Sequence, residues 1–463
     1  MKKLFFNIFI FCMFLFSCGL LPNDNSGFWA KNFKTDKYYN VNAELLYEGT
    51  HCNVWAEIGS GITSKQAENI ANEYDEIIYQ KMVSTFSIKD FYFNDLPFSN
   101  IMEFADWLGD RDDKLCILLL DIKDNYIKDK YNAYIAGYFW GGNLLNEYRS
   151  NYRDMIYLDT YPSITYVPLE ETFNTLAHEM QHLMNFSTSI IERFYEEGVM
   201  LMDTWVDEGL SAAAEWVYSG HSKERINWFQ NNGNSKGNEG LINKGNNFFV
   251  WDNRENESSY ALLDDYATVY LFFQWLRLQT NISVYKDIIS SEHYDFNAVL
   301  AAMINYSDWD ALLKTWLAAN YINDPYSQYG YKNDPDLKNI FVPAPNKIET
   351  SVKLAPGEGV YSKVSTEPNI LGQGININNV YLTDIINNSF IPDSIMLTYN
   401  KNTNIFGRTE IGKTTGEPAG AIASFLSFGR SVLSETTFPY RIGAEDLLRQ
   451  RTYNRKPIII NIE

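Results

Sequence analysis

The sequence is poor in basic residues, histidine and cysteine, and each shortage narrows the functions to be considered. Its 463 residues include 38 Lys and Arg against 58 Asp and Glu, which gives a formal net charge of −20. Because such a surface repels polyanions, we expect no nucleic-acid partner. Only 5 residues are histidine, so a pair of histidines at a metal-binding spacing carries weight. Hydrophobic residues make up 45% of the chain, which excludes a disordered protein.

Long apolar runs are also missing, apart from one segment at the start of the chain. Leu4 to Phe16 are almost all apolar, follow two lysines and have the length of a signal-peptide core, which is too short to span a bilayer. Ser17 and Cys18 then place a small residue before a cysteine, as in a bacterial lipobox. We predict that residues 1–17 are a lipoprotein signal peptide and that lipid on Cys18 anchors the exported protein to a membrane, at the cell surface or in the periplasm. A plain signal peptide that contains cysteine is the alternative.

Two further cysteines, Cys52 and Cys116, remain in the body of the chain. In an oxidising compartment they can pair, but two cysteines do not establish a bridge from sequence. Two buried free thiols are an equally good interpretation.

The rest of the chain divides into three parts by composition and periodicity. Residues 18–44 are rich in Asn, Asp, Lys and Gly and predict a tether between the lipid and a folded domain. Residues 45–335 begin with short apolar strands and an amphipathic helix, and are mainly helical from residue 168 onwards, with a polar loop at 225–258. Residues 340–463 contain short alternating runs separated by proline and glycine, which predict a β-rich C-terminal module. The expected fold class is α+β, with a mixed sheet and helices in the central domain.

This pattern predicts individual elements of the central domain. Strands are expected near residues 45–58, 115–120, 134–140 and 155–158, and helices over residues 63–83, 168–186, 206–216, 260–277 and within 301–322.

One pentapeptide concentrates metal-binding chemistry. Residues 178–182 read His-Glu-Met-Gln-His within a predicted helix, and histidines four residues apart share one side of a helix, so His178 and His182 can bind the same metal ion. Glu179 lies about 100° round the helix from His178 and can act as the general base toward a metal-activated water. Chance would produce this pattern about once in several hundred such chains. The alternative is a helix whose histidines merely pack or face solvent.

A metal held by two histidines needs a further protein ligand. Glu208 begins a predicted helix and can turn toward the metal, while Gly209 permits a close approach between helices. Asp207 is expected to orient a ligand, although acids at a helix N-terminus often serve only the helix dipole. Other residues remain open as the third ligand, namely Glu215, Glu196, Glu197 and His221.

These residues together resemble the gluzincin metallopeptidases, in which HExxH is followed by an Asn/Asp-Glu-Gly segment that supplies a glutamate ligand. More closely, the chain resembles the hyicolysin family of bacterial secreted neutral metallopeptidases over about residues 46–320. The matching segments are residues 52–55, 75–79, 136–140, 155–159, 175–182, 205–211 and 265–273. The resemblance implies a zincin-like domain and a Zn²⁺ endopeptidase acting on proteins or peptides. It implies His178, His182 and Glu208 as zinc ligands and Glu179 as the base, but it does not predict the lipid anchor.

Two other features of the site are weaker predictions. Tyr266, in the apolar helix from residue 260, is our candidate for stabilising the oxyanion, with Tyr270 one turn further; both can equally be core residues. The Asn- and Asp-rich residues 249–265 are compatible with Ca²⁺, but they lack EF-hand spacing, which favours a solvated loop.

A binding protein is the alternative functional hypothesis. An acidic chain with 16% aromatic residues and an unassigned β-rich module also suits a non-catalytic, adhesin-like surface lipoprotein whose metal site is structural. A truncated zinc aminopeptidase is disfavoured, because no Gly-x-Met-Glu-Asn-like segment is present to bind a free amine.

Overall fold

The computed structural model describes the folded body of the chain. The described residues are 27–86, 114–128, 133–144, 149–195, 198–199, 201–220, 222–231, 260–340, 342, 357, 359–363, 375–377, 380–384, 395–401, 403 and 440–442. The predicted signal peptide and Cys18 lie outside them, as do Glu196, Glu197, His221 and most of the loop considered for Ca²⁺. Among the described residues, no helix is long and apolar enough to cross a membrane.

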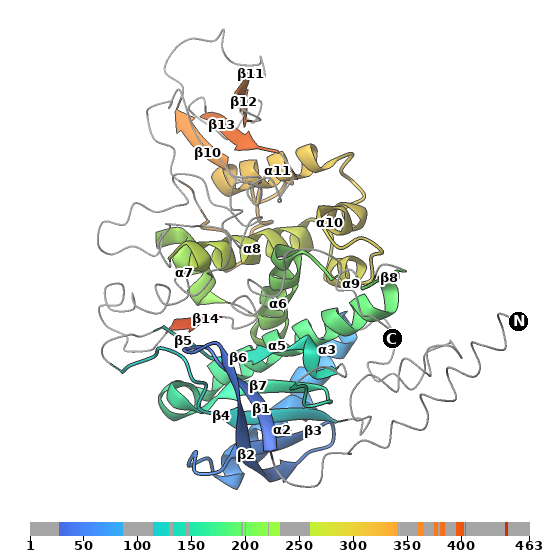
Figure 1. The fold of residues 1–463 in the computed structure, drawn as a ribbon. Coiled ribbons are helices and arrows are strands. Elements are labelled where there is room, and N and C mark those ends of the chain that lie inside the picture. The colour runs from blue at the N-terminus through green and yellow to red at the C-terminus, as the bar shows by residue number, and fades with distance from the viewer. Residues whose placement is uncertain are drawn as a thin grey trace, which may run out of the picture.

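A six-stranded mixed sheet forms one end of the molecule (Figure 1). In spatial order its strands are β1 (Gly27–Asn32), β2 (Lys37–Glu48), β3 (Cys52–Glu57), β4 (Leu115–Leu120), β7 (Met155–Asp159) and β6 (Gly137–Phe139). The first three are antiparallel, β3, β4 and β7 are parallel, and β6 is antiparallel at the edge. Every residue of β4 and β7 is buried, as expected for central parallel strands. The predicted strand region 45–58 contains β3 and the end of β2, and the regions 115–120 and 155–158 match β4 and β7. The region 134–140 matches β6 and most of β5 (Ala133–Ile135).

The tether prediction is wrong for residues 27–44, which form β1 and much of β2. The polar composition of this segment hides a period of two, because Phe28 and Ala30 in β1 and Val41 and Ala43 in β2 are all buried. Phe28 also packs edge-on against Trp55 of β3, with ring centroids 5.3 Å apart. The hairpin is therefore part of the core.

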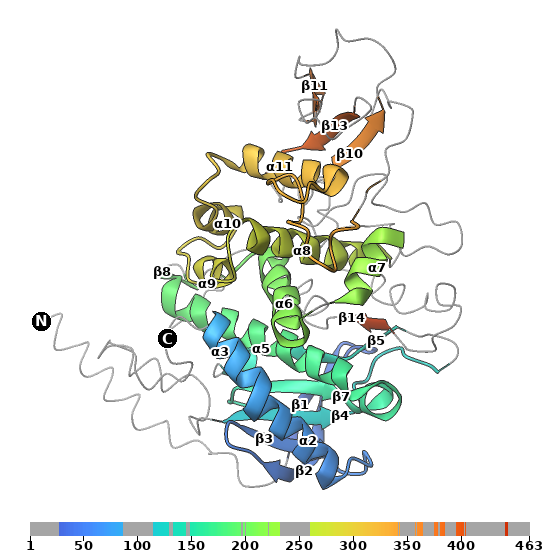
Figure 2. The same cartoon turned by 180° about the vertical axis from the view of Figure 1, so that it is seen from behind.

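Helices cover the sheet and then lead away from it, in the order α5, α6, α8 and α11 (Figures 1 and 2). The helices are α2 (Ser64–Glu73), α3 (Tyr79–Phe86), α5 (Leu169–Glu192), α6 (Thr204–Ser219), α7 (Lys223–Asn231), α8 (Tyr260–Gln279), α9 (Val284–Ile289), α10 (Phe296–Ala302) and α11 (Trp309–Ile322). A π-helical turn (Tyr74–Ile78) joins α2 to α3, and further short elements are a 3₁₀ turn (Gly141–Leu144), a π-helical turn (Thr160–Ile164), β8 (Phe194–Tyr195) and β9 (Gly198–Val199). One prediction needs correction, because α7 occupies the start of the expected polar loop. The helix expected within 301–322 is confirmed as α11, and the end of α10 also falls in this range.

The HExxH helix, α5, is confirmed and continues six residues beyond the predicted end at residue 186. Glu170 and Glu171 occupy its first turn, where the helix dipole favours acids. The helix can approach β6 closely because residue 137 is glycine. A Cβ atom there would lie 2.8 Å from both the Thr175 Cγ2 and the Tyr157 carbonyl oxygen.

A second close approach joins α6 to α8. A Cβ atom at Gly209 would clash with the Phe273 ring. Gly209 therefore permits a close approach between helices, as predicted, but the neighbouring helix is α8 and not α5, the helix of the metal-binding motif. Around this contact lies an aromatic cluster, in which the Trp205 ring centroid is 5.9–6.4 Å from three other rings. The cluster consists of Trp205, Phe272, Phe273, Trp309 and Trp316.

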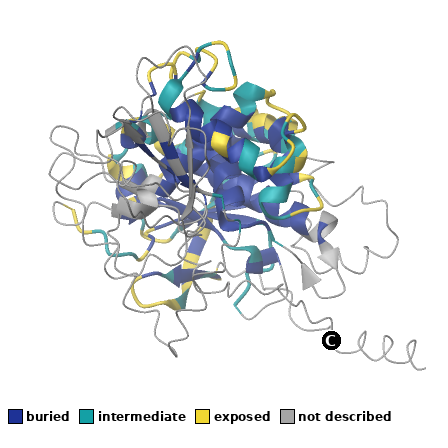
Figure 3. Ribbon diagram, turned by 90° about the horizontal axis from the view of Figure 1, so that it is seen from above, coloured by how far each residue is buried: buried dark blue, intermediate teal, exposed yellow. Residues whose placement is uncertain are grey.

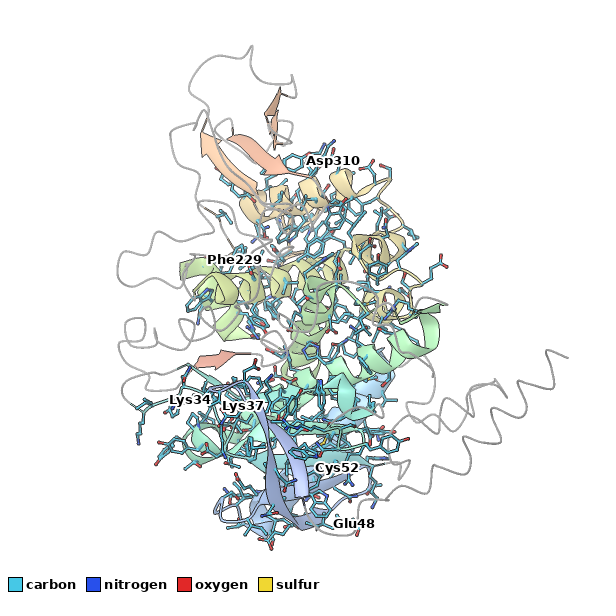
Figure 4. The ribbon with its side chains drawn as sticks, viewed as in Figure 1. Lys34, Lys37, Glu48, Cys52, Phe229 and Asp310 are labelled. Atoms are coloured by element: carbon cyan, nitrogen blue, oxygen red, sulfur yellow. The ribbon has the colours of Figure 1, made fainter. Side chains whose placement is uncertain are left out.

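Strands described in the C-terminal region form a second, antiparallel sheet. Its order is β10 (Gly359–Lys363), β13 (Ile395–Asn400), β12 (Val380–Asp384) and β11 (Ile375–Ile377), while β14 (Tyr440–Ile442) pairs with β5. The sheet packs on α11: Tyr361 donates a hydrogen bond of 2.5 Å to the Leu317 carbonyl, and Tyr399 and Lys401 both reach Asp310. Figure 4 shows Asp310 beside this sheet. The strands β10 and β13 thus share an interface with α11.

The buried residues concentrate in the helices and strands at the centre of the molecule (Figure 3). Cys52 and Cys116 belong to this core as thiols rather than as a disulfide. Their strands pair one residue out of step, since Cys52 lies opposite Leu115 and Asn53 lies opposite Cys116. Overall, the α+β fold class predicted from the sequence is confirmed.

Candidate active site

Two polar stripes meet where α5 packs against α6. On α5 the polar positions follow one another at intervals of four, three, four and four residues, which keeps them on one helix face: His178, His182, Asn185, Ser189 and Arg193. On α6 the facing positions are Asp207, Glu208, Ser211 and Glu215. All nine residues are buried, with at most 4% exposure. Polar groups this deep require hydrogen-bond or metal partners.

Three of these residues converge on one point. The Nε2 atoms of His178 and His182 are 3.1 Å apart, and the Glu208 carboxylate oxygens lie 3.4 Å and 3.6 Å from them. Neighbouring ligands of a tetrahedral zinc ion are separated by about 3.3–3.6 Å. The three side chains therefore have the spacing of ligands to a single ion, and no other such group of His, Cys, Asp or Glu occurs in the part of the chain that the structure describes.

Carboxylates on α6 set the orientation of both imidazoles. The His178 Nδ1 lies 2.8 Å from Glu215 Oε1, and the His182 Nδ1 lies 3.0 Å from Asp207 Oδ2. A carboxylate accepts a hydrogen bond, so each Nδ1 carries the proton and each Nε2 presents a lone pair. Two lone pairs that face each other over 3.1 Å repel unless a cation lies between them. The arrangement thus fits a bound metal better than a metal-free histidine pair.

From His178 the network leads outward to α7 and α8. The Arg225 Nη2 lies 3.1 Å from Glu215 Oε1, and its guanidinium lies 4.5 Å from the centroid of the Tyr266 ring. That ring is in turn 6.4 Å from the His178 ring, so Tyr266 borders the site. Tyr270 lies one turn further along α8. Its pKa is raised, mainly by burial and further by the neighbouring Tyr285 hydroxyl and the charge of Glu215.

From His182 the network leads inward. Ser211 Oγ lies 3.0 Å from His182 Nδ1 and donates a 2.5 Å hydrogen bond to Gln181 Oε1. Asn185 donates from its Nδ2 to Asp207 Oδ1. The carboxylate of Asp207 is thereby fixed from the side opposite His182.

Glu179, the predicted base, follows His178 directly and is 2% exposed. A carboxylate at this depth is costly unless positive charge lies nearby, and the convergence point of His178, His182 and Glu208 is where a cation fits. The structure thus brings His178, His182 and Glu208 together, with Glu179 next to His178 in α5 and the Tyr266 ring 6.4 Å from the His178 ring.

Glu215 has another role than the one considered from the sequence, and the part played by Arg225 was not predicted. Glu215 was open as a third ligand, but it lies on the Nδ1 side of His178 and so acts as that ring's partner. Its spacing of seven residues from Glu208, two helical turns along an alanine-rich helix, was the signal for a shared face. Arg225 gave no signal, because it falls in a segment predicted as a loop.

The chain is similar in sequence to a known metalloprotease. Over 273 residues the chain is 30% identical to the neutral metalloprotease ShpI of Staphylococcus hyicus. The aligned stretch is 58% of this chain and 55% of that protein, so the chain spans about half the length of the relative that it matches. No protein-family model matches the chain. The resemblance to neutral metallopeptidases drawn from the motifs is confirmed by this similarity.

The contact between Glu215 and His178 predicts a loss of metal affinity in Glu215→Gln, which removes the charge behind the imidazole and keeps the side-chain shape. We expect the metal dissociation constant to rise about 10–100-fold, measured by competition with a chromophoric chelator. Glu171→Gln, which replaces an exposed acid in the first turn of α5, the helix of His178, is the control and should leave the constant unchanged. Equal affinities in the two variants would contradict this role of Glu215.

Proposed function

We propose that the protein is a zinc-dependent endopeptidase that hydrolyses peptide bonds in protein or peptide substrates. The observation that carries the proposal is the convergence of His178, His182 and Glu208 within 4.8 Å of one another, with Glu179 adjacent on α5. Imidazole and carboxylate are ordinary zinc ligands, and three protein ligands leave a fourth position for substrate or water. The similarity to a neutral metalloprotease supports the same activity.

Each residue of the site has a defined task in this reaction. His178, His182 and Glu208 hold the ion, which supplies, when bound, a Lewis acid that polarises a carbonyl and acidifies a water. The Glu179 carboxylate takes the proton of the attacking water and returns it to the leaving amine nitrogen. The Tyr266 hydroxyl donates a hydrogen bond to the carbonyl oxygen of the scissile bond as negative charge develops there.

Glu179→Gln separates chemistry from metal binding. Because the amide cannot accept the proton, we expect casein cleavage to fall about 10²–10⁴-fold, while zinc content stays at one ion per chain. Both quantities are measured on residues 19–463, with Glu171→Gln as the control. Unchanged cleavage would contradict the role of Glu179. Zinc binding without cleavage in the wild-type protein would instead favour the non-catalytic surface protein.

Tyr266→Phe tests the oxyanion donor. Removing one hydroxyl that acts only in the transition state should lower kcat about 10²–10³-fold with little change in KM or zinc content. Tyr270→Phe removes the same group one turn further along α8 and serves as the matched control. If both variants retain wild-type kcat, Tyr266 is a core residue.

We further propose that the enzyme is exported and anchored to a membrane through lipid on Cys18. The support is the sequence itself: a basic start, an apolar stretch and a small residue before cysteine. Cys18→Ser should abolish incorporation of a labelled fatty acid and move the protein from the membrane fraction to the soluble one. A wild-type protein that incorporates no label would contradict the anchor and leave the peptidase proposal intact.

A further inference from the structure

Arg193, which directly follows α5 as its C-cap residue, is a fully buried cation. Its side chain is 0% exposed. The Nη1 atom donates to the Ile289 and Ser291 carbonyls at 3.0 Å and 2.9 Å, and Nη2 donates to Ser189 Oγ at 2.5 Å and to Asn185 Oδ1 at 3.3 Å. The guanidinium therefore joins α5 to the connection between α9 and α10.

Asn185 links this cation to the metal site. Its amide oxygen faces Arg193 and its amide nitrogen donates to Asp207, whose other carboxylate oxygen contacts the His182 Nδ1 at 3.0 Å. The amide dipole thus points its positive end at a buried anion and its negative end at a buried cation. We call Arg193, Asn185 and Asp207 the Arg193 relay.

The same connection between α9 and α10 also contacts the start of α6. The Asp203 backbone N–H, directly before α6, donates a 2.7 Å hydrogen bond to the Tyr294 carbonyl. Residues 289–294 are therefore attached both to the end of the helix that carries the histidines and to the start of the helix that carries Asp207 and Glu208.

We propose that Arg193 is a positioning residue for the metal site: through Asn185 and Asp207 it fixes the ring of His182, and it couples the packing of residues 284–294 to metal binding. The inference rests on the proposed zinc site and deepens it. Buried charge is stabilised when hydrogen-bonded groups of opposite sign surround it, so each member of the relay stabilises the placement of the next. By thermodynamic linkage, a relay that favours metal binding is itself made more rigid by the bound metal.

Two variants on α5 separate this role from ordinary helix packing. Asn185→Ala and Ser189→Ala each remove one buried hydrogen-bond acceptor of the Arg193 guanidinium, but only Asn185 lies between Arg193 and His182. We expect Asn185→Ala to raise the zinc dissociation constant about 10–100-fold and to shift the visible absorption bands of the Co²⁺-substituted protein. Ser189→Ala should lower the melting temperature and leave both metal properties unchanged.

Hydrogen exchange of the wild-type protein tests the coupling without any substitution. Adding Zn²⁺ to the metal-free protein should slow amide exchange in residues 284–294, while residues 27–48 at the far edge of the sheet exchange at the same rate.

Two results in a wild-type protein that binds zinc would overturn the inference. The first is an equal zinc affinity of Asn185→Ala and Ser189→Ala, and the second is the absence of zinc-dependent protection in residues 284–294. A wild-type protein that binds no zinc at all would overturn the proposed function together with this inference. If Asn185→Ala does not fold, the exchange measurement decides alone.

Discussion

Two imidazole nitrogens held 3.1 Å apart, each with its lone pair turned toward the other, are the constraint around which this structure is organised. The carboxylates of Glu215 and Asp207 impose that orientation, and they do so because α6 packs directly on α5. Glycine at positions 137 and 209 lets α5 approach β6 and lets α6 approach α8, so both helices are also packed closely on their other sides. The sheet and the outer helices thus set the distance between two rings.

The charges around His178 and His182 also favour a bound cation. Four carboxylates, those of Glu179, Asp207, Glu208 and Glu215, are at least 96% buried, and hydrogen bonds from Arg225 and through Asn185 from Arg193 bring two positive charges to them. With the four carboxylates ionised and both arginines charged, these six side chains sum to −2, the charge that a divalent cation would balance. Burying an uncompensated pair of charges is expensive, so we expect metal binding and folding of this region to be coupled.

The local sequence pattern predicted those features that depend on residues close together in the chain. The HExxH helix, the buried strands and the glycine contact of α6 follow from periodicity and residue size, and the spacing of His178 and His182 placed both on one face. The local pattern could not predict that Arg225 and Arg193 contact the site. Both reach it only because α7 and the end of α5 pack against segments that are distant in the sequence. The β1–β2 hairpin was missed because its polar residues outnumber the few apolar ones that face the core.

The aromatic cluster beside Gly209 has a spectroscopic consequence. Trp205 lies three residues before Glu208 and packs against rings of α8 and α11, in an asymmetric environment that produces near-ultraviolet circular dichroism. Such bands disappear when fixed side-chain packing is lost, even where helices persist. Trp205 therefore contributes to a near-ultraviolet signal that reports fixed packing around the helix of Glu208, and this signal can be followed separately from the secondary structure.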